Sequence, residues 1–112
     1  MKVLQMETDL TSFPTEMEAE ADVEQIILDI VKGRAPQTVA GTPSILLMRP
    51  NGTSTEFNQN SSVSGNRITY NVPASCYTAK GKITLALILT NGSQRSTLGL
   101  VTIYVRSMLK TQ

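Results

Sequence analysis

The stretch Pro43-Ser44-Ile45-Leu46-Leu47-Met48-Arg49-Pro50-Asn51-Gly52-Thr53 decides the fold. Its apolar residues 45–48 run into Pro50-Asn51-Gly52, where proline presets φ for a turn and Asn-Gly accepts the positive φ that tight turns need. The polar, β-prone residues 53–57 follow, so we predict a hairpin with a buried first strand and a half-exposed second strand. A helix is disfavoured because two prolines bracket so short a run.

Strand patterns continue beyond this hairpin. Residues 67–72 alternate apolar and polar side chains and predict a half-buried strand, and residues 82–90 predict a long buried strand. Asn91-Gly92 predicts a second hairpin turn, after which residues 93–105 return with Gly99 as a bulge or close approach. This last strand carries apolar residues on both faces, which is typical of a central strand or a subunit contact. We expect an edge strand at residues 2–8 and a long connection at residues 32–43. A surface loop is expected at residues 58–65 and a crossing loop at residues 73–81.

The segment from Thr15 to Gly33 is ambiguous between helix and strand. Capping-box spacing at residues 15–18, acidic residues in the first turn, and Gly33 after Lys32 all favour a helix. Residues 26–31 are mostly β-branched, which favours a strand. We predict a loop with a possible helical turn to about residue 22, then a buried or bulged strand over residues 23–31.

Length and composition fit one all-β domain. The chain has 112 residues, of which 40% are hydrophobic and only 4% aromatic, so its core must consist mainly of aliphatic side chains. About seven strands at short spacing predict an immunoglobulin-like antiparallel β-sandwich with an acidic N-terminal arm. We divide the chain into an N-terminal arm or edge strand plus acidic loop (1–22), a β-sandwich domain (23–106) and a C-terminal tail (107–112).

Several classes of function are disfavoured. The chain has no histidine, which removes the usual general base and the commonest metal ligand, and its one cysteine, Cys76, cannot form an internal disulfide. The N-terminus lacks the apolar core of a signal peptide, and no apolar run approaches the ~20 residues of a membrane span. We therefore expect a soluble, cytoplasmically made protein that is not an enzyme and needs no cofactor.

The charge is divided sharply along the chain. Residues 1–29 hold eight of the nine acidic residues and one of the ten basic residues, so this part has a net charge of −7 and the remainder +8. The acidic segment is either a solvated loop or an arm that pairs with the basic body of its own or a neighbouring subunit. The basic residues are scattered singly, which disfavours nucleic-acid binding.

The candidate interaction residues are four acids and two tyrosines. The acids are Glu16, Glu18, Glu20 and Asp22. Their spacing lacks the signature of a calcium loop, so we predict no metal site. Tyr77 lies in the expected crossing loop and is expected to bond back to the backbone, and Tyr104 is the second candidate interaction tyrosine. Cys76 has no accompanying base and is expected to be a small buried residue.

Five segments have a recognisable order: residues 24–33, 39–53, 65–73, 81–87 and 96–105. Together they resemble the N-terminal immunoglobulin-like domain of phage baseplate upper proteins. Related small sandwiches occur in head fibres and capsid-decorating proteins of tailed phages. The resemblance implies a non-enzymatic structural protein of a bacteriophage virion, made in the bacterial host cytoplasm. It would be an adaptor or decoration subunit, a homo-oligomer that binds other virion proteins of the baseplate, tail or capsid surface. A glycan-binding or adhesion module acting at a cell surface is the alternative.

Overall fold

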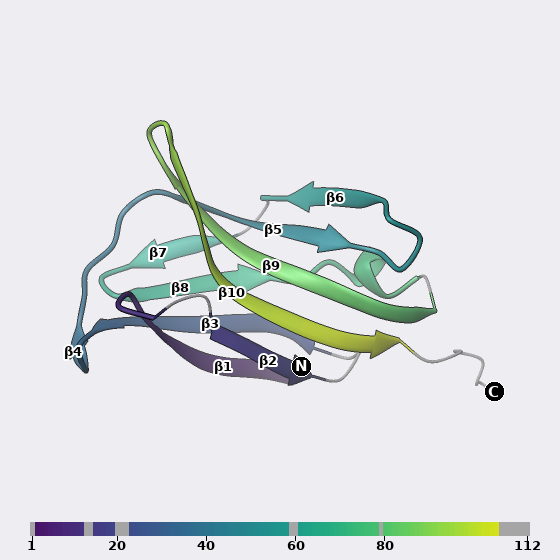
Figure 1. Cartoon of the computed structure of the whole chain (residues 1–112), viewed down its shortest axis with the longest axis horizontal. Helices are drawn as coiled ribbons and strands as arrows, with labels where there is room; N and C mark the ends of the chain where they lie inside the picture. The colour runs from purple at the N-terminus through teal and green to yellow at the C-terminus, as the bar shows by residue number, and fades with distance from the viewer. Residues whose placement is uncertain (1, 13–14, 20–22, 59–60, 79, 106–112) are drawn as a thin grey trace.

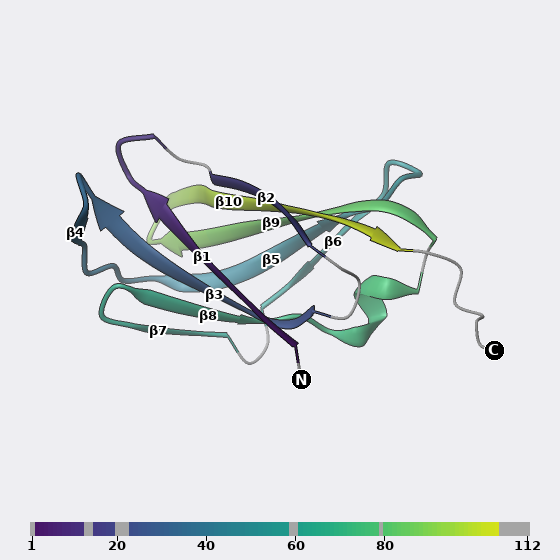
Figure 2. The same ribbon diagram turned by 90° about the horizontal axis from the view of Figure 1, so that it is seen from below.

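Two β-sheets face each other in the computed structural model (Figures 1 and 2), which describes residues 2–12, 15–19, 23–58, 61–78 and 80–105. Sheet A contains β1 (Lys2–Asp9), β3 (Val23–Lys32), β8 (Arg67–Asn71) and β7 (Ser62–Ser64) in that order, with the two-residue β4 (Ala35–Pro36) on β3. Sheet B contains β2 (Thr15–Ala19), β10 (Gln94–Val105), β9 (Gly81–Asn91), β5 (Thr42–Met48) and β6 (Ser54–Phe57) in that order. The all-β sandwich-like fold predicted from the sequence is confirmed.

The hairpin predicted around Pro50-Asn51-Gly52 is confirmed as β5 and β6. The two strands pair antiparallel from Ile45 opposite Phe57 to Met48 opposite Ser54, and Gly52 has a φ of +88° in the turn. Ile45 and Leu47 are fully buried, whereas β6 alternates between exposed and half-buried residues. The first strand is therefore the buried partner, as its uninterrupted apolar run indicated.

The helix signals between residues 15 and 33 do not produce a helix. Ile26, Leu28 and Ile30 alternate along β3 and are fully buried, which is the period of a strand. Gly33 and Arg34, with φ of +59° and +76°, form the two-residue turn between β3 and β4, so Gly33 ends a strand rather than a helix. The predicted loop or helical turn before residue 22 was wrong for residues 15–19, which form β2.

The N-terminal segment supplies an edge strand to each sheet. β1 is the predicted edge strand of sheet A, and it runs parallel to β3 with Met6 opposite Leu28. The chain then passes to sheet B, where β2 runs parallel to β10 with Met17 opposite Val101. Both sheets are therefore mixed, which departs from the antiparallel immunoglobulin-like arrangement expected from the sequence. The predicted tail at residues 107–112 lies outside the described residues.

The β9–β10 hairpin is the longest element of the fold, and Figure 1 shows its tip extending past the rest of sheet B. Gln94 pairs with Asn91, so the turn is centred on Gly92 and Ser93, one residue later than the Asn-Gly turn that we predicted. The register shifts between Thr97 and Gly99, which confirms the predicted bulge. A Cβ on Gly99 would lie 3.3 Å from carbon atoms of two neighbouring side chains, so the predicted close approach is also confirmed.

The core between the sheets is mainly aliphatic, as the composition predicted. Tyr70 on β8 is the largest fully buried side chain, and its hydroxyl donates a hydrogen bond of 3.1 Å to the carbonyl oxygen of Ile88 on β9. This bond joins sheet A to sheet B through the core. It satisfies the polar end of a side chain that is otherwise surrounded by apolar groups.

Candidate interaction surfaces

The outer face of sheet A is mainly polar, although Val3 and Ile27 also lie on it, and its polar side chains are hydrogen-bonded to one another. Asp29 accepts two hydrogen bonds from the Arg67 guanidinium, at 2.8 and 3.2 Å, and one of 3.1 Å from the amide of Gln5. The Arg67 hydrogen bonds hold the pKa of Asp29 below its usual value. Gln25 donates to Asn71 at 3.2 Å. These contacts run across β1, β3 and β8, so much of the hydrogen-bonding capacity of this face is used within the chain.

The outer face of sheet B has an apolar band instead. Leu100, Ala86 and Leu46 lie opposite one another across β10, β9 and β5, and the next row contains Met48 on β5. These residues face outward because their strand neighbours, such as Leu47, point into the core. Leu46, Met48 and Leu100 are half-buried, and Ala86 is only 3% exposed. We call Leu46, Met48, Ala86 and Leu100 the sheet B band.

Three of the predicted interaction residues lie along one side of this band. Glu16 and Glu18 are exposed on β2, opposite Leu100 and Thr102 of β10. Tyr104 is 52% exposed further along β10 and lies opposite Lys82 of β9. Glu20 and Asp22 lie outside the described residues. The acidic edge and Tyr104 therefore belong to the same face as the sheet B band.

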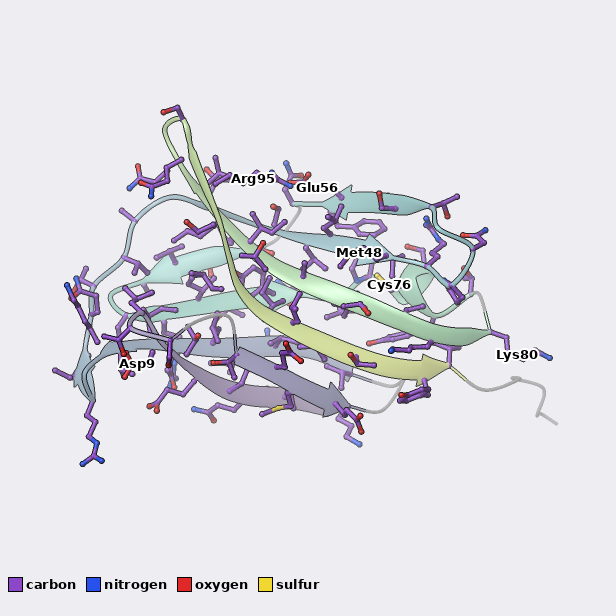
Figure 3. The ribbon with its side chains drawn as sticks, viewed as in Figure 1. Asp9, Met48, Glu56, Cys76, Lys80 and Arg95 are labelled. Carbon is purple, nitrogen blue, oxygen red and sulfur yellow. The ribbon has the colours of Figure 1, made fainter. Side chains whose placement is uncertain are left out.

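The opposite side of the band contains an ion pair that the sequence did not indicate. Arg95 of β10 donates to Glu56 of β6 at 2.7 and 3.0 Å, and Ser44 donates to the same carboxylate at 2.7 Å. Figure 3 shows Arg95 and Glu56 directed toward each other above β5. The Arg95 bonds, followed by the Ser44 bond, lower the pKa of Glu56. Only the strand order, which sequence spacing does not reveal, brings these residues together.

Tyr77 and Cys76 lie in the 3₁₀ turn η1 (Ala74–Tyr77). The Tyr77 hydroxyl donates a hydrogen bond of 2.6 Å to the carbonyl oxygen of Val23 at the start of β3, which confirms the expected bond to the backbone. Cys76 is buried, and burial raises the pKa of its thiol to about 11, against a smaller opposing effect of Arg49. At neutral pH the thiol is protonated and a poor nucleophile. Both residues therefore act as structural groups.

A pocket of about 360 Å³ lies beside the turn end of the β9–β10 hairpin. Leu10, Val39, Leu89 and Leu98 supply its apolar surface, and polar groups such as Asn91 stand beside them. None of its lining residues is ionisable, so none of these side chains could serve as a general acid or base. Within the described ranges, no group of three or more Cys, Asp or Glu residues is placed to hold a metal ion, and no helix has the length and apolarity to cross a membrane.

Comparisons with known proteins give a likeness in fold. No family model matches the sequence, and no curated protein matches it. Among solved structures, the chain is similar to the N-terminal domain of phage TP901-1 ORF48, with a TM-score of 0.58 and 12% sequence identity. The match covers 96% of this chain and 100% of that domain. The two chains therefore share a fold over almost their whole length, and this likeness to a phage domain does not single out an immunoglobulin-like arrangement.

Proposed function

We propose that the chain is a structural protein of a tailed-phage virion, a β-sandwich adaptor or decoration subunit. The observation that carries the proposal is the likeness in fold to a phage protein domain over 96% of the chain. The sequence resemblance of residues 23–105 to baseplate upper proteins supports the same assignment. The subunit would be made in the bacterial cytoplasm and would join the baseplate, the tail or the capsid surface.

The proposed mechanism is assembly without catalysis, metal or cofactor. The sheet B band offers apolar area that a partner can bury, and the mainly polar outer face of sheet A suits contact with water. Glu16 and Glu18 at one side of the band would orient a partner with a basic surface. Other virion proteins and further copies of this chain are the proposed partners.

Incorporation into particles tests the proposal. Purified particles of the phage that encodes the chain are expected to contain it by mass spectrometry and immunogold labelling. Leu46→Glu places a charge on the sheet B band and is expected to abolish incorporation, whereas Thr69→Glu on the outer face of sheet A is a control expected to assemble normally. Circular dichroism would confirm that both variants fold. Particles that lack the wild-type protein would contradict the proposed function.

A glycan-binding role is the second candidate, and the exposure of Tyr104 favours it. An exposed tyrosine beside Lys82 offers a flat apolar surface and a cation to a sugar ring. In this case the isolated protein would bind on a glycan array, and Tyr104→Ala would abolish binding without lowering stability. Tyr77 is not a suitable test position because its hydroxyl is bonded to Val23.

A further inference from the structure

The outer side of β1 is a strand edge along which no other described strand pairs. β1 pairs with β3 on one side and lies at the end of sheet A (Figure 1). The amide of Leu10 donates to the carbonyl of Val31 on β3 at 2.9 Å, and the backbone groups of successive residues point to opposite sides of a strand. The register with β3 is regular from Val3 onward, so the even-numbered residues of β1 bond to β3. Val3, Gln5 and Glu7 therefore direct their backbone N–H and C=O groups toward the outer side.

β1 is also the least protected of the four edges. It contains eight residues, whereas the other edge strands, β2, β6 and β7, contain five, four and three. Proteins usually protect strand edges by keeping them short or by placing proline or charged residues on them. β1 contains no proline, and its charged residues, Lys2, Glu7 and Asp9, lie toward its two ends. The uncharged middle of the strand, residues 3–6, thus has the length and backbone geometry to accept an added strand.

The side chains on both sides of this edge also favour an added strand. Met6 is buried on the inner side, and Leu4 is half-buried beside it and packs against the core. On the outer side Val3 is 44% exposed, and Gln5 is exposed two residues further along. A strand added to β1 would cover the exposed parts of Leu4 and Val3 while its backbone pairs with that of β1.

The charges along the edge indicate the direction and the identity of the added strand. Lys2 lies at the beginning of β1, whereas Glu7 and Asp9 lie near its end. A second copy of β1 in antiparallel orientation places the basic beginning of each strand beside the acidic end of the other, which is attractive at both ends. The neighbouring strand β3 has its exposed charges in the opposite order, with Glu24 at its beginning and Lys32 at its end. The sign of the charge therefore alternates from strand to strand across the join between two copies.

The other acidic residues near β1 do not oppose this pairing. Glu16 and Glu18 lie on β2, the adjacent strand of sheet B. Met17 between them packs against the core, so the two carboxylates point away from sheet A. On β3, Asp29 accepts two hydrogen bonds from the Arg67 guanidinium, which balances its charge. The ends of β1 and β3 therefore set the charge balance at the join.

We propose that two copies of the chain pair antiparallel along β1, so that their A sheets form one continuous sheet across a dimer. The register places Gln5 opposite Gln5 of the second copy. Leu4 then lies opposite Met6 on the inner side, where both are apolar, and Val3 lies opposite Glu7 on the outer side. Residues 2–8 of the two strands pair through about six backbone hydrogen bonds, and no two charged residues stand directly opposite each other. A register centred on Met6 would instead place Leu4 opposite a threonine.

This contact uses sheet A, whereas the proposed contact with other virion proteins uses the sheet B band. Its role in a particle rests on the proposed function. Self-association of the purified chain can be measured without other virion proteins, so the two proposals fail separately. A single pair of edge strands buries less area than the ~1,600 Å² of a standard interface, so we expect a weak dimer with a dissociation constant on the order of 100 µM.

Sedimentation velocity of the purified chain from about 10 to 1,000 µM tests the pairing, and the wild type is expected to pass from monomer to dimer over this range. Gln5→Pro removes an N–H group that points to the outer side of β1, so it should weaken dimerisation about tenfold or more while circular dichroism stays unchanged. Leu46→Glu on the sheet B band is the control, with wild-type dimerisation expected. A wild type that stays monomeric, or a dimer that is lost in Leu46→Glu and kept in Gln5→Pro, would overturn the proposal.

Oxidative crosslinking tests the register. Gln5→Cys places two thiols opposite each other with Cα atoms about 5.5 Å apart, a separation that a disulfide can span. Glu7→Cys is the matched control, because the two substituted positions are offset by four residues along the strands, about 13 Å. Gln5→Cys is expected to form a covalent dimer and Glu7→Cys is not, and the wild type should stay uncrosslinked because Cys76 is buried. Crosslinking of Glu7→Cys in preference to Gln5→Cys, or of neither variant, would refute the β1 pairing.

Discussion

Replacing Tyr77 with phenylalanine removes one hydroxyl and leaves the ring in place. The lost bond is the 2.6 Å contact to the Val23 carbonyl, which ties the η1 turn to the beginning of β3. A partly buried hydrogen bond between neutral groups contributes about 1 kcal/mol net to the free energy of unfolding. For a domain of this size, a loss of about 1 kcal/mol lowers Tm by roughly 4 °C.

Equilibrium unfolding in urea measures this loss. With a slope of about 1.5 kcal/mol per molar urea, the midpoint of Tyr77→Phe should fall by about 0.7 M with no change in slope. Tyr70→Phe, which loses the 3.1 Å bond to Ile88, should show a loss of similar size. Tyr104→Phe should match the wild type because that side chain is 52% exposed. The reasoning is refuted if Tyr77→Phe unfolds like the wild type while Tyr70→Phe does not.

Three further predictions concern packing, acid stability and thiol reactivity. Gly99→Val should cost about 1–3 kcal/mol in thermal unfolding because even a Cβ there lies 3.3 Å from neighbouring carbons, and Gly99→Ala should cost less. The pKa values of Asp29 and Glu56 are lowered in the fold, so their stabilisation is complete above about pH 4–5 and is lost as pH falls through the lower folded values. Asp29→Asn should therefore flatten the acid limb of stability measured from pH 2 to 6, and an unchanged limb would contradict it. Cys76, with its thiol pKa raised to about 11, should react with a thiol reagent at pH 8 only after urea unfolds the protein, and fast labelling of the native protein would count against its burial.

Local turn chemistry made most of the strands predictable. The strands within residues 45–57 and 82–105 were assigned correctly, apart from an offset of one residue in the second turn, because turn residues and apolar runs are read from adjacent positions. The strand at residues 15–19 was missed because its acids and its threonine also satisfy a helix start. Thr15, Met17 and Ala19 alternate with Glu16 and Glu18, so a period of two was present in the sequence. Only pairing with β10 decides between the two interpretations.

The candidate site was less predictable than the fold because it depends on strand order. Glu16, Glu18 and Tyr104 were named from the sequence, yet their position on one face follows from β2 lying beside β10. Leu46 and Leu100 could not be linked to each other before the register across β9 was known. Tyr77 was predicted as an interaction residue, but its hydroxyl donates a hydrogen bond within the chain, to the carbonyl oxygen of Val23. The sequence alone indicates which side chains are candidates for an interaction surface. The strand register indicates which of these side chains are neighbours.

The two-sided apolar character of the central strands is the feature that links fold to function. In β10, Leu98 and Val101 fill the core while Leu100 faces outward, and Ala86 and Leu46 extend the same outer row. A sandwich needs only one apolar face per sheet, and the outer side of sheet A, although it includes Val3 and Ile27, is crossed by polar contacts such as that between Asp29 and Arg67. Core packing therefore does not explain the apolar residues on the outside of sheet B. The proposed burial against a partner would explain them, and Leu46→Glu tests that explanation because it changes this surface while leaving the core unaltered.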